Sequence, residues 1–179
     1  MTKKPESLFW NQVRAKMPTH WFSTRIENRV GEGVPDVFVC AEGLSFWLEL
    51  KVTKTNRLHI SSGQIGWNYA LHKSGGVSFF LVNLPSNSNL YLFEGKEGRG
   101  LKDNGLAISG SGTVVPCLWS GSDWSGLFGT MLDVVGDRVG SRVGSGSSSG
   151  TKTDWEQDQD NKQNQVLSSM ELLARMSGG

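Results

Sequence analysis

The chain has 179 residues, which is enough for one domain of ordinary size with an extension. Its net charge is +1, with twelve Lys and Arg against eight Asp and Glu in residues 1–100 and six against nine in residues 101–179. The mildly basic first part permits a polyanionic partner without requiring one. Two cysteines are too few for a disulfide framework, so we expect a reducing compartment. Because no stretch of 18 apolar residues and no apolar run behind Met1 occurs, we expect a cytoplasmic protein without membrane contact.

The first half of the sequence predicts an α/β fold. Pro5 suits the first position of a helix over 5–17, and Pro18 ends it. An extended segment follows at 20–30, with strands over 34–41 and 44–53, a helix over 61–74 closed by two glycines, and strands over 77–84 and 90–94. This αβββαβ order, with its short last strand, predicts a mixed central sheet flanked by helices.

Composition changes near residue 95, and we place the end of the first domain at residue 94. We expect residues 95–138 to form an irregular extension, in which the apolar spacing over 119–135 leaves open an extra helix packed on the domain. Gly and Ser dominate 139–150, so 139–165 is predicted to be a flexible linker. The last segment, 166–179, has the spacing of a short amphipathic helix that would dock on a protein partner.

The stretch GVPDVFVCAEGLSFWLELKV, residues 33–52, reads as a hairpin whose core-like strands carry three charged residues. With the turn at Glu42-Gly43, paired positions sum to 85, and one face of the hairpin is then wholly apolar. The other face pairs Phe38 with Trp47 and Asp36 with Glu49, and Lys51 follows Glu49 on that face. A slip of one residue would mix the two faces, so the pattern itself predicts this register.

Two carboxylates placed opposite each other repel, and the predicted hairpin therefore needs a compensating charge. A divalent cation between Asp36 and Glu49 would supply it, and hard oxygen ligands favour Mg²⁺ or Mn²⁺ over zinc. Lys51 would then stand beside the metal-bound water or a scissile phosphate. These three residues outline a site for phosphodiester hydrolysis. The alternative is a solvated sheet face with an ordinary Glu–Lys pair.

The spacing of GVPD and ELK resembles the PD-(D/E)XK nuclease superfamily, over roughly residues 6–84. The flanking RIENRVGEGVPDVFVC and FWLELKV are most similar to small phage and bacterial members of the Holliday-junction-resolvase-like and VRR-NUC-like branch. The resemblance implies a restriction-endonuclease-like core and an endonuclease. In such an enzyme Asp36 and Glu49 would bind Mg²⁺, or Mn²⁺ in its place, and Lys51 would assist catalysis. A phage-encoded chain would act in the host cell cytoplasm.

Three further residues enter through the resemblance. It implies a metal-binding Glu in the first helix, here Glu6, and a catalytic Gln in the helix after ELK, here Gln64; the backbone of Leu50 would add a further metal ligand. Each side chain also has an ordinary explanation. Glu6 suits the first turn of a helix because of the helix dipole. Gln64 completes the capping box Ser61-Ser62-Gly63-Gln64.

Basic residues flank the predicted site and would contact phosphates, which adds affinity with little sequence information. They are Arg25, Arg29, Lys54, Arg57 and Lys73. No base-reading element is evident, so we expect DNA that is branched or otherwise structured, such as a junction or flap, and a symmetric substrate would favour a homodimer. Other possibilities stay open: RNA as substrate, a sequence-specific homing or restriction-type enzyme, an inactive nucleic-acid-binding module, and an interaction protein acting through its C-terminal helix.

Several other residues are interpreted without a catalytic role. Glu27 lies near the site in sequence and is either a supporting group or an exposed strand charge, and Glu32 is read as a loop charge. Cys40 is expected to be an ordinary buried thiol. The three histidines, His20, His59 and His72, do not have metal-ligand spacing, so we expect no zinc site.

Overall fold

The computed structural model describes residues 5–26, 32–106, 108–109 and 112–144. Its centre is a mixed six-stranded sheet in the order β1-β2-β3-β4-β5-β8. The strands are β1 (Phe22–Arg25), β2 (Val37–Ala41), β3 (Leu44–Val52), β4 (Ser78–Leu84), β5 (Asn89–Glu94) and β8 (Trp119–Gly121). β3 and β4 are parallel, and the other neighbouring pairs in this sheet are antiparallel. The predicted α/β class and mixed sheet are confirmed.

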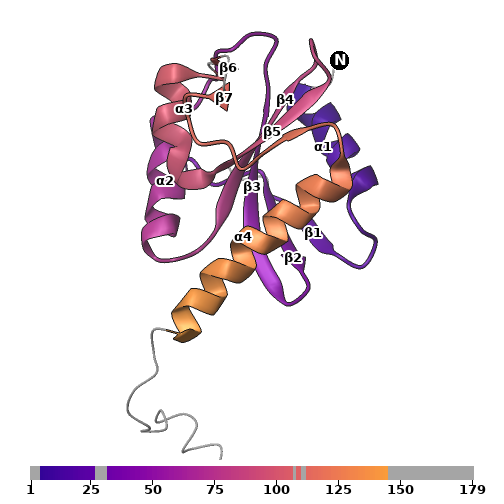
Figure 1. Ribbon diagram of the computed structural model, residues 1–179, viewed down its shortest axis with the longest axis vertical. Helices are drawn as coiled ribbons and strands as arrows, with labels where there is room; N and C mark the ends of the chain where they lie inside the picture. Colours follow the sequence, from indigo (N-terminus) through magenta and orange to yellow (C-terminus); the bar gives the residue numbers. More distant parts are fainter. Residues whose placement is uncertain (1–4, 27–31, 107, 110–111, 145–179) are drawn as a thin grey trace, which may run out of the picture. The chain divides into compact units, whose positions relative to one another are not determined.

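Helices cover both faces of the sheet (Figure 1). Apolar residues of α1 (Pro5–Lys16) and α4 (Trp124–Gly144) share one core cluster with Val37, Leu48 and Leu81. On the opposite face, Phe80 and Val82 lie in a second cluster with residues of α3 (Gly98–Asn104), and Ile65 of α2 (Ser62–Lys73) packs against it. The 3-10 helix η1 (Gly95–Glu97) links β5 to α3, and the short β6 (Ile108–Ser109) pairs with β7 (Gly112–Thr113).

The hairpin of β2 and β3 has the predicted register. Val37 pairs with Leu48, Phe38 with Trp47 and Ala41 with Leu44. Both turn residues have positive φ, 51° at Glu42 and 76° at Gly43, as the two-residue turn of a twisted hairpin requires. Alternate residues of β2 are fully buried and the others partly exposed, so the apolar face packs on α1 and α4. The face that carries the charges points toward α2.

The first domain does not end at residue 94, and this corrects the prediction. Strand β8 extends the same sheet beyond β5, and the α4 side chains Leu127, Met131 and Val135 are no more than 1% exposed. The compact unit that contains the sheet continues to Ser141. Helix α4 contains most of the 119–135 segment for which a packed helix was left open, and it continues past residue 139, where the Gly/Ser composition predicted the start of a flexible linker.

A charged cluster joins α4 to the end of β5. The buried carboxylate of Glu94 accepts a hydrogen bond from Arg138 of α4, and it forms an ion pair with Lys96 at 2.5 Å. Arg138 also contacts His72 of α2 at 2.6 Å. Burial, followed by the Arg138 charge, lowers the pKa of His72. These contacts give α4 a fixed polar anchor in addition to its apolar one.

Two sets of predictions lie outside the described residues. The first set covers 145–179, which holds the main part of the predicted linker and the whole predicted C-terminal amphipathic helix. The second set consists of Glu27 and Arg29. Among the helices that the structure describes, none has the length and apolar character needed to cross a membrane.

Candidate active site

Asp36 stands directly before β2, where a close loop contact holds it. Its backbone carbonyl accepts from Ile26 at 2.8 Å, and its Oδ2 accepts from the Leu50 N–H of β3 at 2.9 Å. The preceding Gly33 has φ +93°, and a Cβ there would lie 2.1 Å from the backbone carbon of Gly63. Glycine is therefore required at Gly33, where the loop before Asp36 lies against the first turn of α2.

Glu49, Lys51 and Gln64 form one hydrogen-bonded group. Glu49 Oε1 lies 2.9 Å from Lys51 Nζ and accepts from the Gln64 amide nitrogen at 2.5 Å. Lys51 Nζ also donates to the Gln64 amide oxygen at 3.1 Å. The ammonium has three N–H donors, so two are directed at these partners and one is available. The Glu49 side chain is 3% exposed and that of Lys51 14%, which keeps this pair largely out of water.

The capping box of α2 is present, and it positions Gln64 within the site. Ser61 Oγ accepts from the Gln64 N–H at 3.1 Å, and the Gln64 side-chain oxygen accepts from the Ser61 N–H at 3.1 Å. The same amide thus serves the helix terminus and the Glu49–Lys51 pair. The two explanations offered by the sequence, capping and a place in the site, are compatible because an amide has both donor and acceptor groups.

Aromatic side chains border the charged group on its sheet face. The rings of Phe38 and Trp47 are 5.0 Å apart, and those of Trp47 and Trp67 of α2 are 5.2 Å apart. Burial, then repulsion by Asp36, raises the pKa of Glu49 to about 7 although Lys51 opposes the shift. Burial also raises the pKa of Asp36, against the opposing Leu50 hydrogen bond and the Lys51 charge. The site therefore resists holding two carboxylates without a further cation.

The two carboxylates fit a divalent cation. Glu49 Oε2 is buried and has no hydrogen-bond partner in the described part of the chain. A buried carboxylate oxygen without a partner is costly, and a hard cation would relieve that cost. Within the described ranges, no group of three His, Cys, Asp or Glu side chains could share an ion. Asp36 and Glu49 would therefore act with backbone or water oxygens, which suits Mg²⁺ because it retains several waters.

The other predicted ligands lie near this pair in different ways. Glu6, partly buried in the first turn of α1, raises the pKa of both Asp36 and Glu49 by repulsion, although it does not complete a three-residue metal group with them. Leu50 contacts Asp36 through its N–H, and its carbonyl as a ligand stays a prediction. The Arg25 charge on β1 opposes the rise that burial causes in the pKa of Asp36, and Arg25 donates to Ser7 at 3.2 Å.

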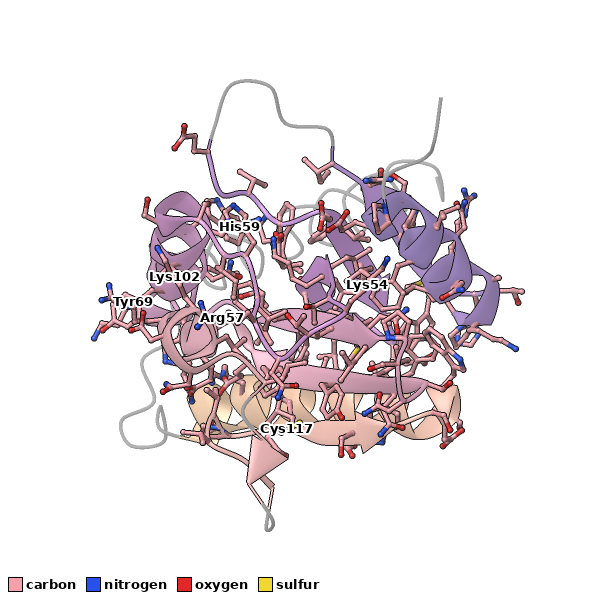
Figure 2. All side chains as sticks on the ribbon, turned by 90° about the horizontal axis from the view of Figure 1, so that it is seen from above. Lys54, Arg57, His59, Tyr69, Lys102 and Cys117 are labelled. Carbon is pink, nitrogen blue, oxygen red and sulfur yellow. The ribbon has the colours of Figure 1, made fainter. Side chains whose placement is uncertain are left out.

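The predicted phosphate-binding residues separate into groups. Lys54 and Arg57 are exposed on the segment that follows β3 (Figure 2). Lys73 is exposed at the far end of α2, about 13 Å along the helix from Gln64, so it is not gathered at the site. Lys102 of α3 lies instead in one pocket with Arg57 and His59. Sequence reasoning missed Lys102, because its segment carried no strand or helix signal linking it to the hairpin.

Comparisons with known proteins add little to this geometry. No family model matches the chain, and no curated protein matches it. Among solved structures, the chain is similar to Hjc of Archaeoglobus fulgidus, a Holliday junction resolvase from an archaeal hyperthermophile, with 15% sequence identity and a TM-score of 0.40. That similarity covers 51% of this chain and 74% of the resolvase. The functional conclusion therefore depends on the residues of the site.

Proposed function

We propose that this protein is a Mg²⁺-dependent endonuclease of the PD-(D/E)XK type that acts on DNA. The observation that carries the proposal is the buried Oε2 of Glu49 beside Asp36 and Lys51, which has no hydrogen-bond partner among the residues that the structure describes. A structural ion pair would need no such oxygen, and a solvated sheet face would not bury it. The resemblance of GVPD and ELK to that nuclease superfamily supports the same chemistry.

Each residue has a role that its contacts support. Asp36 and Glu49 would hold the metal ion, which when bound polarises phosphoryl oxygen and lowers the pKa of water. The available N–H of Lys51 would orient the attacking water or offset charge on the phosphate. Gln64 positions Lys51 and Glu49 through its two amide hydrogen bonds. Glu6 and the Leu50 carbonyl are supporting candidates.

We propose branched or flapped DNA as the substrate. The exposed cations Lys54 and Arg57 follow the strand that carries Glu49, where they would meet phosphates beside the scissile bond. Phosphate contacts recognise the backbone and its shape, so they favour selection by structure over selection by base sequence. A homodimer would suit a symmetric junction.

Cleavage assays test the proposal. A labelled four-way junction, a flap and a linear duplex are incubated with the full chain in Mg²⁺, in Mn²⁺ and in EDTA. We expect metal-dependent cutting whose rate falls by at least about 100-fold in Lys51→Ala, because general acid–base catalysis and electrostatic stabilisation of the transition state each contribute on that scale. The matched control is Lys16→Ala, which removes an exposed lysine of α1.

Two outcomes would count against the enzyme. Equal cutting by wild type, Lys51→Ala and Lys16→Ala would place the activity outside this site. A lack of cutting on every substrate, with DNA binding unchanged by Lys51→Ala, would instead favour a nucleic-acid-binding module without catalysis.

A further inference from the structure

A pocket of about 690 Å³ lies between residues 57–62 and the C-terminal turn of α3. Its lining includes Arg57, His59 and Lys102, which are gathered on this side of the molecule (Figure 2). Within the part of the chain that the structure describes, no hydrogen bond or ion pair engages these three side chains. Asp103 adds a carboxylate to the lining, and Arg99 already holds it at 2.8 Å. The pocket is thus cationic and its cations are available.

The two walls of the pocket are fixed to each other. The Leu106 N–H, directly after α3, donates to the Asn56 carbonyl at 2.6 Å. Gly105 has φ +63°, and a Cβ there would lie 2.0 Å from the same Asn56 oxygen. Leu58 and Ile60, which also line the pocket, are buried at 8% and 2% exposure and anchor its other wall in the core. The pocket therefore exists before any ligand arrives.

The pocket adjoins the candidate active site through the start of α2. Ser61 lines the pocket, and its N–H and hydroxyl are both bonded to Gln64, which contacts Glu49 and Lys51. One residue, Gln64, therefore connects the lining of the pocket to the carboxylate of Glu49 through direct hydrogen bonds on both sides.

We propose that this pocket binds one unpaired nucleotide of the cut DNA strand, next to the scissile phosphate; this inference rests on the proposed function. Arg57 and Lys102 would contact the phosphate, and the exposed imidazole of His59 would stack on the base. The volume of the pocket lies in the usual range for ligand pockets, about 300–1,000 Å³. A base that is paired and stacked inside a duplex cannot enter, so the pocket selects flaps and branch points.

Binding without cleavage tests the pocket directly. A fluorescently labelled oligothymidylate is titrated with the full chain in EDTA at several salt concentrations, and anisotropy is measured. We expect Lys102→Ala to weaken binding and to lower the slope of log affinity against log salt by about 0.7, the value for one lost phosphate contact on a single strand. Asn104→Trp, which fills the pocket without changing charge, should weaken binding with the slope unchanged. Lys16→Ala should alter neither quantity.

A second ligand tests whether the pocket contacts the base of the nucleotide. A strand of the same length without bases should bind wild type more weakly, and Asn104→Trp should remove that difference. The pocket assignment is wrong if Lys102→Ala behaves as Lys16→Ala does, or if Asn104→Trp binds both strands as wild type does.

Cleavage separates this inference from the proposed function. In Mg²⁺, Lys102→Ala and Asn104→Trp should lower the ratio of flap to linear-duplex cutting while both substrates are still cut. Cutting by wild type with an unchanged ratio in both variants would retain the nuclease and overturn the pocket. If wild type cuts nothing, the nuclease proposal fails, and the titrations above still decide whether the pocket takes a nucleotide.

Discussion

At the scale of single residues, burial and charge repulsion in the candidate site act most strongly on the Glu49 carboxylate. The carboxylate is buried beside Asp36, yet Lys51 and Gln64 contact only Oε1. The folded protein therefore favours the protonated acid up to a pH of about 7, whereas a metal ion needs the carboxylate. A metal ion bound as proposed would compete with the proton for the same oxygen atoms.

The pKa of Glu49 predicts how stability changes with pH in the metal-free protein. Because its pKa rises from 4.5 to about 7 on folding, the folded state binds more protons between these values. The stabilising effect of the proton is complete below pH 4.5 and is lost as pH rises through 7, at a cost of about 3 kcal/mol. Asp36 shifts in the same direction. Urea unfolding across this pH range should show the free energy of unfolding falling as pH rises, and Glu49→Gln should reduce that fall.

Mg²⁺ should reverse that loss above pH 7. We expect the ion to raise the melting temperature of wild type at about pH 8 and to leave Glu49→Gln unchanged, because a ligand stabilises only the state that binds it. Asp133→Asn, an exposed change on α4, is the charge-matched control and should respond as wild type does. A full Mg²⁺ response in Glu49→Gln would exclude Glu49 as a ligand.

At the scale of secondary-structure elements, the first turn of α2 assembles the site. It receives the Asp36 loop at Gly63, carries Gln64 to the β3 residues, and borders the cationic pocket at Ser61. A disturbance of this turn should therefore affect the proposed metal site as well as the helix.

Gly33→Ala tests the contact between the loop and α2. The new Cβ would lie 2.1 Å from Gly63 backbone, so the loop must move and take Asp36 with it. The control is Gly43→Ala, which also places alanine at positive φ, +76°, and finds no atom within 4 Å. We expect Gly33→Ala to destabilise the protein by at least about 1 kcal/mol more than Gly43→Ala in urea unfolding, and to weaken the Mg²⁺ response. Equal effects of the two variants would show that the close approach is unimportant.

Ser61→Ala tests the capping box. Loss of this cap should cost about 1 kcal/mol, and Gln64 should hold Lys51 less firmly once its N–H partner is removed. Thermal unfolding measures the first effect, and the rate of metal-dependent cleavage measures the second. Ser62→Ala, at an exposed neighbouring position, should leave stability nearly unchanged.

At the scale of the whole compact unit, α4 decides where the domain ends. Its residues Leu127, Phe128, Met131 and Val135 are buried against the sheet, and burial of four such side chains is worth about 6–12 kcal/mol. That amount is comparable to the entire stability of an ordinary domain, about 5–15 kcal/mol. Residues after 94 are thus part of the fold that supports the site.

Truncation gives the corresponding prediction. A chain that ends at residue 94 should fail to fold cooperatively, because it lacks both β8 and α4. A chain that ends at Gly144 should retain the melting transition and, if the enzyme proposal holds, its metal-dependent cleavage. Circular dichroism and the cleavage assay measure these outcomes. A folded, active 1–94 fragment would contradict the role given to α4.

The amino-acid sequence alone was enough to predict the hairpin and the residues at its centre. Alternation of apolar and polar residues in a strand has a strict period of two, so only one register keeps the apolar face intact, and this places Phe38 opposite Trp47. Charged residues within or at the end of such a strand are costly, which makes Asp36, Glu49 and Lys51 conspicuous in the amino-acid sequence alone. Ser61 and Gln64 were likewise predictable as a cap because that motif is local.

The distant segments that meet this hairpin are visible only once the chain is folded. Examples are the contact of Gly33 with Gly63, the contact of Trp67 with Trp47, and the pocket that Lys102 shares with Arg57. These contacts join separate elements, and local periodicity carries no information about them. For α4 the apolar spacing over 119–135 left a packed helix open, but the face of the sheet that buries it and its continuation past residue 139, into the expected linker, appear only in the folded structure. Burial depends on what the rest of the chain supplies as a partner, and that becomes known only when the chain has folded.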